Sequence, residues 1–412
     1  MPDSSFRPAT SAARNVALYP WFQFARNLVF WQAIWFLFFQ NRLSAAEAIL
    51  LYAVYDIATT LLEVPSGWFS DRLGRRLTLI LSTLAGALGI ALLGLAGSFP
   101  AFVLGQVLLG GSMAFASGTD SALLYESLED AGQADRIEAE EVRAWRFGFT
   151  GLAFSAVTGG AMALWSYPLA FEASAMAQGV ALIIAFRFVE PGMRRDDIAQ
   201  GGEWARIASI GTALRKPVLI WLFVLSVVMY GFSHIPFVFG QPFIEQALAP
   251  LGLSDEAPLV SGAVSTAMML LSVLVSLRAE WLRARLGLVG LVLMAFAMQI
   301  GLVAVLALTD SVLAIAVLFL RMVPDALSTP FIRARIQPEL ESRSRATFLS
   351  LKSLIGRILF AGSLWIAAGT TGGVDGLIYE EMKPILTSYA LVGFAVLAGL
   401  ALASRRVALD RG

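Results

Sequence analysis

The sequence predicts an all-α, polytopic membrane protein with twelve transmembrane helices in two pseudo-symmetric bundles of six. Three observations predict this class: the composition, the spacing of the apolar runs and the distribution of arginine. Of the 412 residues, 58% are hydrophobic and only 15% are charged. Soluble domains carry about 25% charged residues. The composition therefore indicates a chain that lies largely within a lipid bilayer.

The apolar runs have the length of membrane-spanning helices. A hydrocarbon core of ~30 Å requires about 20 apolar residues per helix. The first run is too long for the core of a signal peptide and lacks a small-residue cleavage site, so we expect it to be retained. The twelve predicted spans are 18–40, 45–69, 77–96, 100–125, 145–165, 168–189, 217–240, 258–279, 286–308, 311–332, 345–369 and 385–404.

Arginine marks one side of the predicted membrane protein. The loops on that side are rich in arginine, whereas the basic residues of the opposite loops are Arg42 and Lys383. Basic residues accumulate in cytoplasmic loops. We therefore expect an inner (plasma) membrane protein with both termini in the cytoplasm and an even number of spans. The arginine-rich loops are 70–76, 126–144, 190–216, 280–285 and 333–344.

The longest polar loop, 190–216, falls between the sixth and seventh predicted spans. It divides the chain into two halves with six spans each. We predict an N-terminal six-helix bundle over 1–195, a cytoplasmic linker over 196–216 and a C-terminal six-helix bundle over 217–412.

Several classes of function are disfavoured by composition. Thirty basic and thirty acidic residues give a net charge of zero, which argues against a nucleic-acid partner. The chain has no cysteine and one histidine, His234, which argues against cysteine-ligated zinc, thiol catalysis and a histidine metal cluster. There is no phosphate-binding Gly-x-x-x-x-Gly-Lys-Ser/Thr run. We therefore expect no enzyme activity, no metal and no cofactor.

A charged turn between the second and third spans carries the most specific pattern in the chain. The pattern is Gly-x-x-x-Asp-Arg-x-Gly-Arg-Arg, and its fixed positions are Gly67, Asp71, Arg72, Gly74, Arg75 and Arg76. It resembles the loop-2/3 signature of the major facilitator superfamily, which comprises twelve-helix secondary transporters. The stretch 278–287 in the second half is similar to a degraded copy of this turn.

The resemblance implies a cytoplasmic gate. In the superfamily, the Asp and Arg of this loop form a breakable latch as the two halves rock against each other. It implies a gate built from Gly67, Asp71, Arg72, Gly74, Arg75 and Arg76. Glu126 and Glu190, at the ends of the fourth and sixth spans, are candidate partners, with solvated helix ends as the alternative. The loop can also serve only as a topology signal.

Ionisable side chains inside the predicted spans mark a second set of candidates. A charge at mid-membrane is costly, so it indicates a pathway or a pair. Asp56 is our candidate for the proton-binding carboxylate, with a static ion pair as the alternative. Arg321 and Asp325 are one helical turn apart, so an in-helix pair is their alternative. The expected substrate and proton-coupling residues are Asp56, Arg26, Gln106, Arg321, Asp325 and Arg357.

The resemblance weakens at two places. Proton-coupled members often carry an arginine in the fourth helix where this chain has Gln106, which weakens the case for coupling through the usual site. Antiporters tend to carry a Gly-Pro pair in a glycine-rich fifth helix, and this chain has Ser155-Ala156 there. Small residues in that helix can also serve helix packing alone. In the seventh helix, Pro236 and Gly240 predict a kinked or broken outer end.

The stretches 63–67 and 345–351 look like those of the drug-efflux branch of the superfamily. We therefore expect export of a small amphipathic organic compound, by alternating access and driven by the proton gradient. The alternatives are import of a small organic anion or metabolite, and a receptor or scaffold without transport. The expected partners are a small-molecule substrate, a coupling proton and the lipid bilayer, and we expect a monomer.

Overall fold

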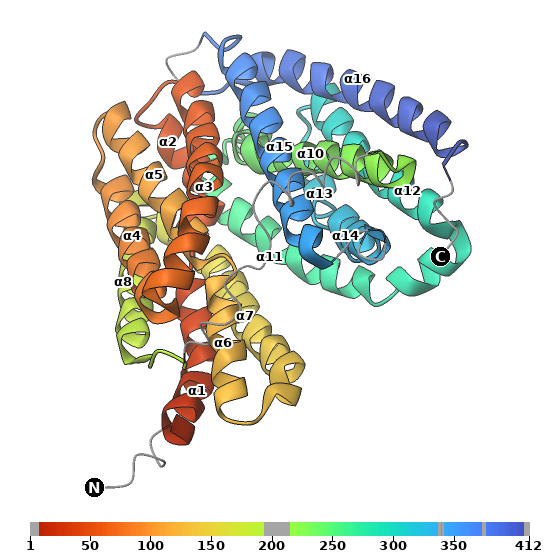
Figure 1. Cartoon of the computed structure of the whole chain (residues 1–412). Coiled ribbons are helices and arrows are strands. Elements are labelled where there is room, and N and C mark those ends of the chain that lie inside the picture. Colours follow the sequence, from red (N-terminus) through yellow and green to blue (C-terminus); the bar gives the residue numbers. More distant parts are fainter. Residues whose placement is uncertain (1–7, 193–214, 337–338, 340–341, 373–375, 408–412) are drawn as a thin grey trace, which may run out of the picture. The chain divides into compact units, whose positions relative to one another are not determined.

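The computed structural model describes residues 8–192, 215–336, 339, 342–372 and 376–407 (Figure 1). Throughout these ranges the regular elements are helices, which confirms the predicted all-α class. The chain divides into two compact units. The first comprises 1–43 and 51–197, and the second comprises 44–50 and 198–412. The predicted linker 196–216 lies almost entirely outside the described residues, so its boundaries stay a prediction.

The first unit is built from helices that are interrupted at two of the predicted spans. Its elements are α1 (Pro8–Arg26), η1 (Phe30–Ala33), α2 (Trp35–Gln40), α3 (Ala45–Leu73), α4 (Arg75–Leu95), α5 (Phe99–Ala116), α6 (Thr119–Asp130), η2 (Ala134–Arg136), α7 (Ile137–Ala163) and α8 (Tyr167–Arg187). α4 packs against α5 and α8, and α1 packs against α6, α7 and α8 (Figure 1). The first predicted span is thus α1, η1 and α2, and the fourth is α5 and α6.

The glycines of the predicted fifth span serve packing. A methyl group added at Gly159 would overlap the carbonyl oxygen of Phe30, and one at Gly151 would lie 2.7 Å from that of Phe24. These contacts let α7 approach the broken first span at backbone distance. The packing interpretation of this glycine-rich stretch is therefore confirmed at these two positions.

The second unit contains α10 (Pro217–Leu248), η4 (Ala249–Leu251), η5 (Ser254–Glu256), α11 (Ala257–Ser276), α12 (Ala279–Leu308), η6 (Val312–Ala314), α13 (Ile315–Leu318), α14 (Val323–Ile336), α15 (Ser342–Ala368) and α16 (Tyr379–Ser404). α12 packs against α16 and α14, and α10 packs against α15. α10 runs on through Pro236 and Pro242 as one helix, so a broken outer end is wrong, and a kink at the prolines stays a prediction. The tenth predicted span is the interrupted one, because residues 319–322 between α13 and α14 form turns.

Within the described residues, ten helices are long and apolar enough to cross a membrane. They match ten of the twelve predicted spans. The first predicted span is missing from this set because it is divided among α1, which has 19 residues but many polar ones, and the short pieces η1 and α2. The fifth lies in α7, whose first half carries several charged residues and whose second half is rich in glycine.

Candidate functional site

The turn between α3 and α4 is fixed by a glycine. Gly74 is the single residue between the two helices and has a φ of 99°, a conformation that favours glycine. A methyl group added here would also lie 2.6 Å from the carboxylate of Glu190. The glycine of the sequence pattern is thus required twice, by its backbone angle and by the approach of a residue that follows α8.

Glu190 binds the start of α4. The backbone N–H groups of Arg75 and Arg76 donate to Glu190 Oε1 at 2.5 Å and to Oε2 at 2.9 Å. These are amides at a helix N-terminus, which have no intrahelical partner and favour a negative charge. Burial and the nearby Glu126 raise the pKa of the Glu190 carboxyl above its usual value, while the two amide bonds oppose that rise.

The side chain of Arg75 connects three elements of the first unit. Its Nε and Nη2 each lie 3.0 Å from Glu126 Oε1 in α6. Its Nη1 donates to Ser70 Oγ in α3 at 2.7 Å. Arg76 Nη2 donates to the carbonyl of Phe186, at the end of α8, at 2.9 Å. The structure therefore brings Arg75 and Glu126 together as an ion pair and places the Glu190 carboxylate on the amides of Arg75 and Arg76, all within one unit.

The other positions of the pattern behave differently. Arg72 is exposed, and its guanidinium lies 4.8 Å from the centre of the Trp68 ring. A methyl group at Gly67 would have open space around it. Asp71 lies in the last turn of α3, but its side chain is outside the described part of the structure. A latch between the two halves therefore stays a prediction for these residues.

The second unit repeats part of this turn. Gly287 interrupts α12 with a φ of 71°, and Arg285 lies 4.1 Å from the centre of the Trp281 ring. The sequences Trp68-x-x-x-Arg72-Leu73-Gly74 and Trp281-x-x-x-Arg285-Leu286-Gly287 share one spacing. The copy in 278–287 thus keeps the glycine conformation and the stacked arginine, while Ala284 stands where the first copy has Asp71.

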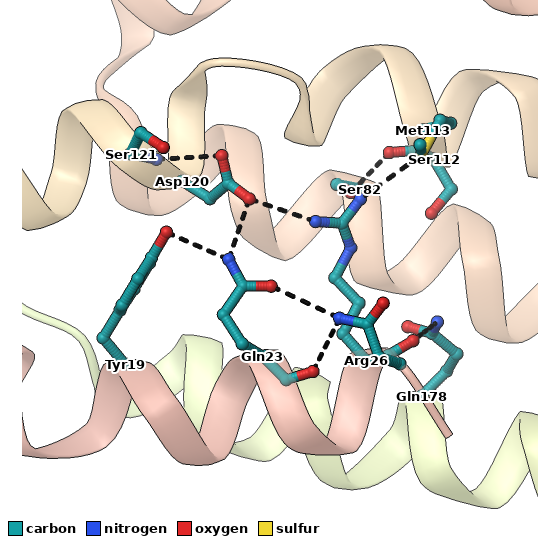
Figure 2. Close-up of polar contacts among 10 residues, drawn as sticks. Tyr19, Gln23, Arg26, Ser82, Ser112, Met113, Asp120, Ser121 and Gln178 are labelled. Carbon is teal, nitrogen blue, oxygen red and sulfur yellow. Dashed lines mark hydrogen bonds and ion pairs between the residues drawn. The ribbon is translucent and has the colours of Figure 1, made fainter. Parts of the chain in front are cut away.

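A polar network lies at the interruptions of the first and fourth spans (Figure 2). Arg26 is the last residue of α1, and its Nη1 lies 3.3 Å from Asp120 Oδ2, in the first turn of α6. Gln23 Nε2 donates to the same carboxylate oxygen and to the hydroxyl of Tyr19, at 2.9 Å each. Ser121 N–H donates to Asp120 Oδ1 at 2.8 Å. Both charged side chains are largely buried, with 13% and 17% exposed.

Neighbouring helices hold this network in place. Gln178 Nε2 of α8 donates to the carbonyl of Arg26 at 3.2 Å, which satisfies a backbone group freed by the end of α1. Arg26 is one of the site residues expected from the sequence, and Asp120 is one of the charges within the predicted spans, whereas Gln23 and Tyr19 are not predicted by any pattern in the sequence. Gly118, with a φ of 76° two residues before Asp120, is the sequence signal that could have located the start of α6.

Asp56 and Gln106 are both deeply buried, with 1% and 4% exposed. Asp56 lies in α3, and Gln106 lies in α5 one turn before Gly110. A methyl group at Gly110 would lie 2.9 Å from the backbone of Tyr55 and Thr59. α5 thus packs closely on the segment that carries Asp56.

The charged residues of the second unit are separated by an interruption. Arg321 lies in the turn between α13 and α14, so it does not share a continuous helix with Asp325, as the in-helix pair required. Its Nε donates to the carbonyl of Ser233 at 3.3 Å. Asp325 accepts from Gln299 Nε2 at 3.1 Å. Arg357, in α15, has its Nε 3.4 Å from Ser353 Oγ.

Comparison with known proteins bears on this arrangement. The family model described as Major Facilitator Superfamily matches residues 16–369. No curated protein matches the chain.

Among solved structures, the nucleoside transporter NupG is 13% identical, with 94% of this chain and 98% of that chain covered and a TM-score of 0.75. An auto-inhibited POT family peptide transporter is 14% identical, covering 95% and 97% with a TM-score of 0.73. A D-xylose-proton symporter is 15% identical, covering 94% and 97% with a TM-score of 0.64. At these identities the likeness concerns the fold.

Proposed function

Because the chain belongs to the major facilitator superfamily, we propose that it exports a small amphipathic organic compound in exchange for protons by alternating access. The observation that carries the proposal is the buried ion pair of Arg26 and Asp120 at the interruptions of two spans. Charged groups at such interruptions mark substrate and ion sites in transporters. The pair supports a polar centre inside the first unit.

Two carboxylates of the first unit are placed to carry the coupling proton. Asp56 is the more buried, with 1% exposed. Asp120 already accepts hydrogen bonds from Gln23 and the Ser121 amide and pairs with Arg26. We therefore assign the proton to Asp56 and give Asp120 a structural role beside Arg26.

The turn 67–76 supports a gate at the predicted cytoplasmic side. Arg75 is tied to Ser70 and Glu126, and Glu190 holds the start of α4. This framework presents Arg72 and the end of α3 at the surface of the first unit. We propose that Asp71 and Arg72 make the contacts that open and close during transport.

Flux in proteoliposomes tests the proton assignment. Purified protein is reconstituted with a compound selected by thermal stabilisation, and flux is measured with and without an imposed pH gradient. We expect Asp56→Asn to abolish gradient-driven flux while leaving exchange of labelled for unlabelled compound intact. Asp120→Asn should impair both processes, because it leaves Arg26 buried without its carboxylate. Gradient-driven flux that survives Asp56→Asn with unchanged pH dependence would remove Asp56 from the mechanism.

Import is the second candidate direction. The D-xylose-proton symporter, whose fold this chain shares, is named for movement of solute with a proton. The direction of the imposed proton gradient distinguishes export by exchange from import by symport. An exchanger accumulates the compound in vesicles that are acidic inside, whereas a symporter accumulates it when the outside is acidic. A receptor or scaffold would give no flux in either arrangement.

A further inference from the structure

Two arginines of the second unit lie on aromatic rings inside the membrane-spanning segments. Arg321 and Arg357 belong to the candidate spans Val312–Arg333 and Leu351–Ala368. The guanidinium carbon of Arg321 lies 4.7 Å from the centre of the Phe237 ring, and that of Arg357 lies 5.9 Å from the centre of the Tyr230 ring. An arginine on an aromatic face keeps its charge and is attracted by the electrons of the ring.

The rings of Tyr230, His234 and Phe360 form one continuous group, and Phe237 lies on the same helix as Tyr230 and His234. The rings of Tyr230 and His234, one turn apart on α10, have centroids 4.2 Å apart. Phe360 of α15 lies 5.7 Å from the His234 ring and 6.3 Å from the Tyr230 ring. We call these residues and their two cations the arginine–aromatic cluster: Tyr230, His234, Phe237, Phe360, Arg321 and Arg357.

The backbone brings the two arginines to the same part of α10. A methyl group added at Gly356 would lie 3.3 Å from the Tyr230 ring, so α15 approaches α10 closely beside Arg357. Arg321 reaches α10 through the Ser233 carbonyl, which precedes His234. Two positive charges therefore lie beside this stretch of α10.

The cluster is partly accessible. Tyr230, His234, Phe237, Arg321 and Arg357 are all half-buried rather than fully enclosed. A guanidinium group recognises carboxylate and phosphate oxygens with two parallel hydrogen bonds. An aromatic ring of a bound molecule can pack on the Tyr230 and His234 rings in an offset or edge-on arrangement. The cluster therefore combines both elements needed for an aromatic anion.

We propose that the arginine–aromatic cluster binds an organic anion in which a carboxylate or phosphate is carried on an aromatic ring. The inference rests on the proposed transport function and names the class of compound that is moved. The anionic group is held by Arg321 and Arg357, and the ring by Tyr230 and His234, which lie against the buried Phe360. Such a compound is amphipathic, with one charged end and one apolar face.

Four matched probes test the assignment on the purified full-length protein. They are 2-naphthoate, its neutral amide, the non-aromatic anion cyclohexanecarboxylate and the aromatic cation naphthylmethylammonium, with affinity measured by calorimetry. We expect 2-naphthoate to bind most tightly. Equal or tighter binding of the amide, the cation or the non-aromatic anion would overturn the proposal, as would a lack of 2-naphthoate binding.

Variants then locate the site. Arg321→Gln and Arg357→Gln should each weaken 2-naphthoate binding by about 10- to 100-fold, as expected for loss of a charged hydrogen-bonding group. Arg42→Gln is the matched control, because Arg42 also lies on an aromatic ring, 4.8 Å from the centre of the Phe38 ring, but outside the cluster. Where the glutamine variants do not fold, Arg321→Lys and Arg357→Lys replace them; lysine keeps the charge but loses the two parallel hydrogen bonds, so 2-naphthoate should still bind more weakly. Unchanged affinity in folded variants at both positions would overturn the assignment.

The outcome for this site is separable from the outcome for transport. Binding of 2-naphthoate without flux in proteoliposomes would support the cluster and contradict the transport proposal. Flux of a neutral or cationic compound without 2-naphthoate binding would support transport and overturn the aromatic-anion assignment.

Discussion

Among single residues, Glu190 fixes the local geometry of the turn 67–76, the proposed gate. Its two carboxylate oxygens accept from the first two amides of α4, and its position leaves no room for a side chain at Gly74. The pattern of glycine and arginine in 67–76 could be found in the sequence. Its contact with Glu190 could not be derived from spacing, because more than a hundred residues separate the two and helix rotation decides which side chains meet.

The variant Glu190→Gln tests this cap. Glutamine keeps one acceptor oxygen but presents an amide nitrogen to the second N–H, so we expect a loss of about 1 kcal/mol of unfolding free energy. Because the pKa of Glu190 is raised in the folded protein, the folded state binds a proton where the unfolded state does not. The stability contributed by Glu190 should therefore increase as pH falls through that raised pKa towards the ordinary value.

Thermal unfolding of the detergent-solubilised protein across pH measures this effect. The difference in melting temperature between wild type and Glu190→Gln should widen on acidification. Asp135→Asn, at an exposed carboxylate in η2, is the control and should leave the curve unchanged. A difference that narrows on acidification would contradict the assigned direction of the pKa.

Among the helices, the interrupted ones carry the charged residues of the candidate site. Arg26, Asp120 and Arg321 each lie at or beside an interruption in a predicted span. Span positions could be predicted from apolar length alone, and ten of them match membrane-length helices. The interruptions were not predicted, because each occupies only a few residues within a long apolar run; Gly118 is the one signal that could have located the break before α6. For that reason Arg321 and Asp325 were interpreted as neighbours on one helix.

The contact between η1 and α7 depends on a glycine, and this gives a second stability prediction. Gly159→Ala should destabilise the protein by about 1–3 kcal/mol, because the added methyl group collides with the Phe30 carbonyl and α7 must shift. Gly179→Ala in α8 is the matched control. A methyl group there meets nothing within 4 Å, and alanine favours the helix by up to about 1 kcal/mol.

Chemical unfolding in mixed micelles measures both glycine variants. We expect the unfolding free energy of Gly159→Ala to be lower than that of wild type, and that of Gly179→Ala to be equal or higher. Equal effects of the two substitutions would mean that the close approach of α7 to the first span does not contribute to stability.

The whole molecule consists of two compact units. Each has its own charges within the spans and its own version of the charged turn, at 67–76 and 278–287. The family match across 16–369 supports a transporter built from two halves. The copy in the second unit keeps Trp281, Arg285 and Gly287 at the spacing of the first. The repeated architecture could be anticipated from loop lengths and arginine content. The substrate could not, because it depends on which side chains of an apolar span face inward.

Cysteine labelling tests the central claim of an alternating-access transporter with its gate turn in the cytoplasm. The chain contains no cysteine, so Leu73→Cys introduces one reactive position on an exposed site beside Arg72. A membrane-impermeant maleimide should label this variant in inverted vesicles and not in intact cells, and the labelling rate should change when a transported compound is added. Labelling in intact cells, or a rate that no transported compound alters, would contradict the account.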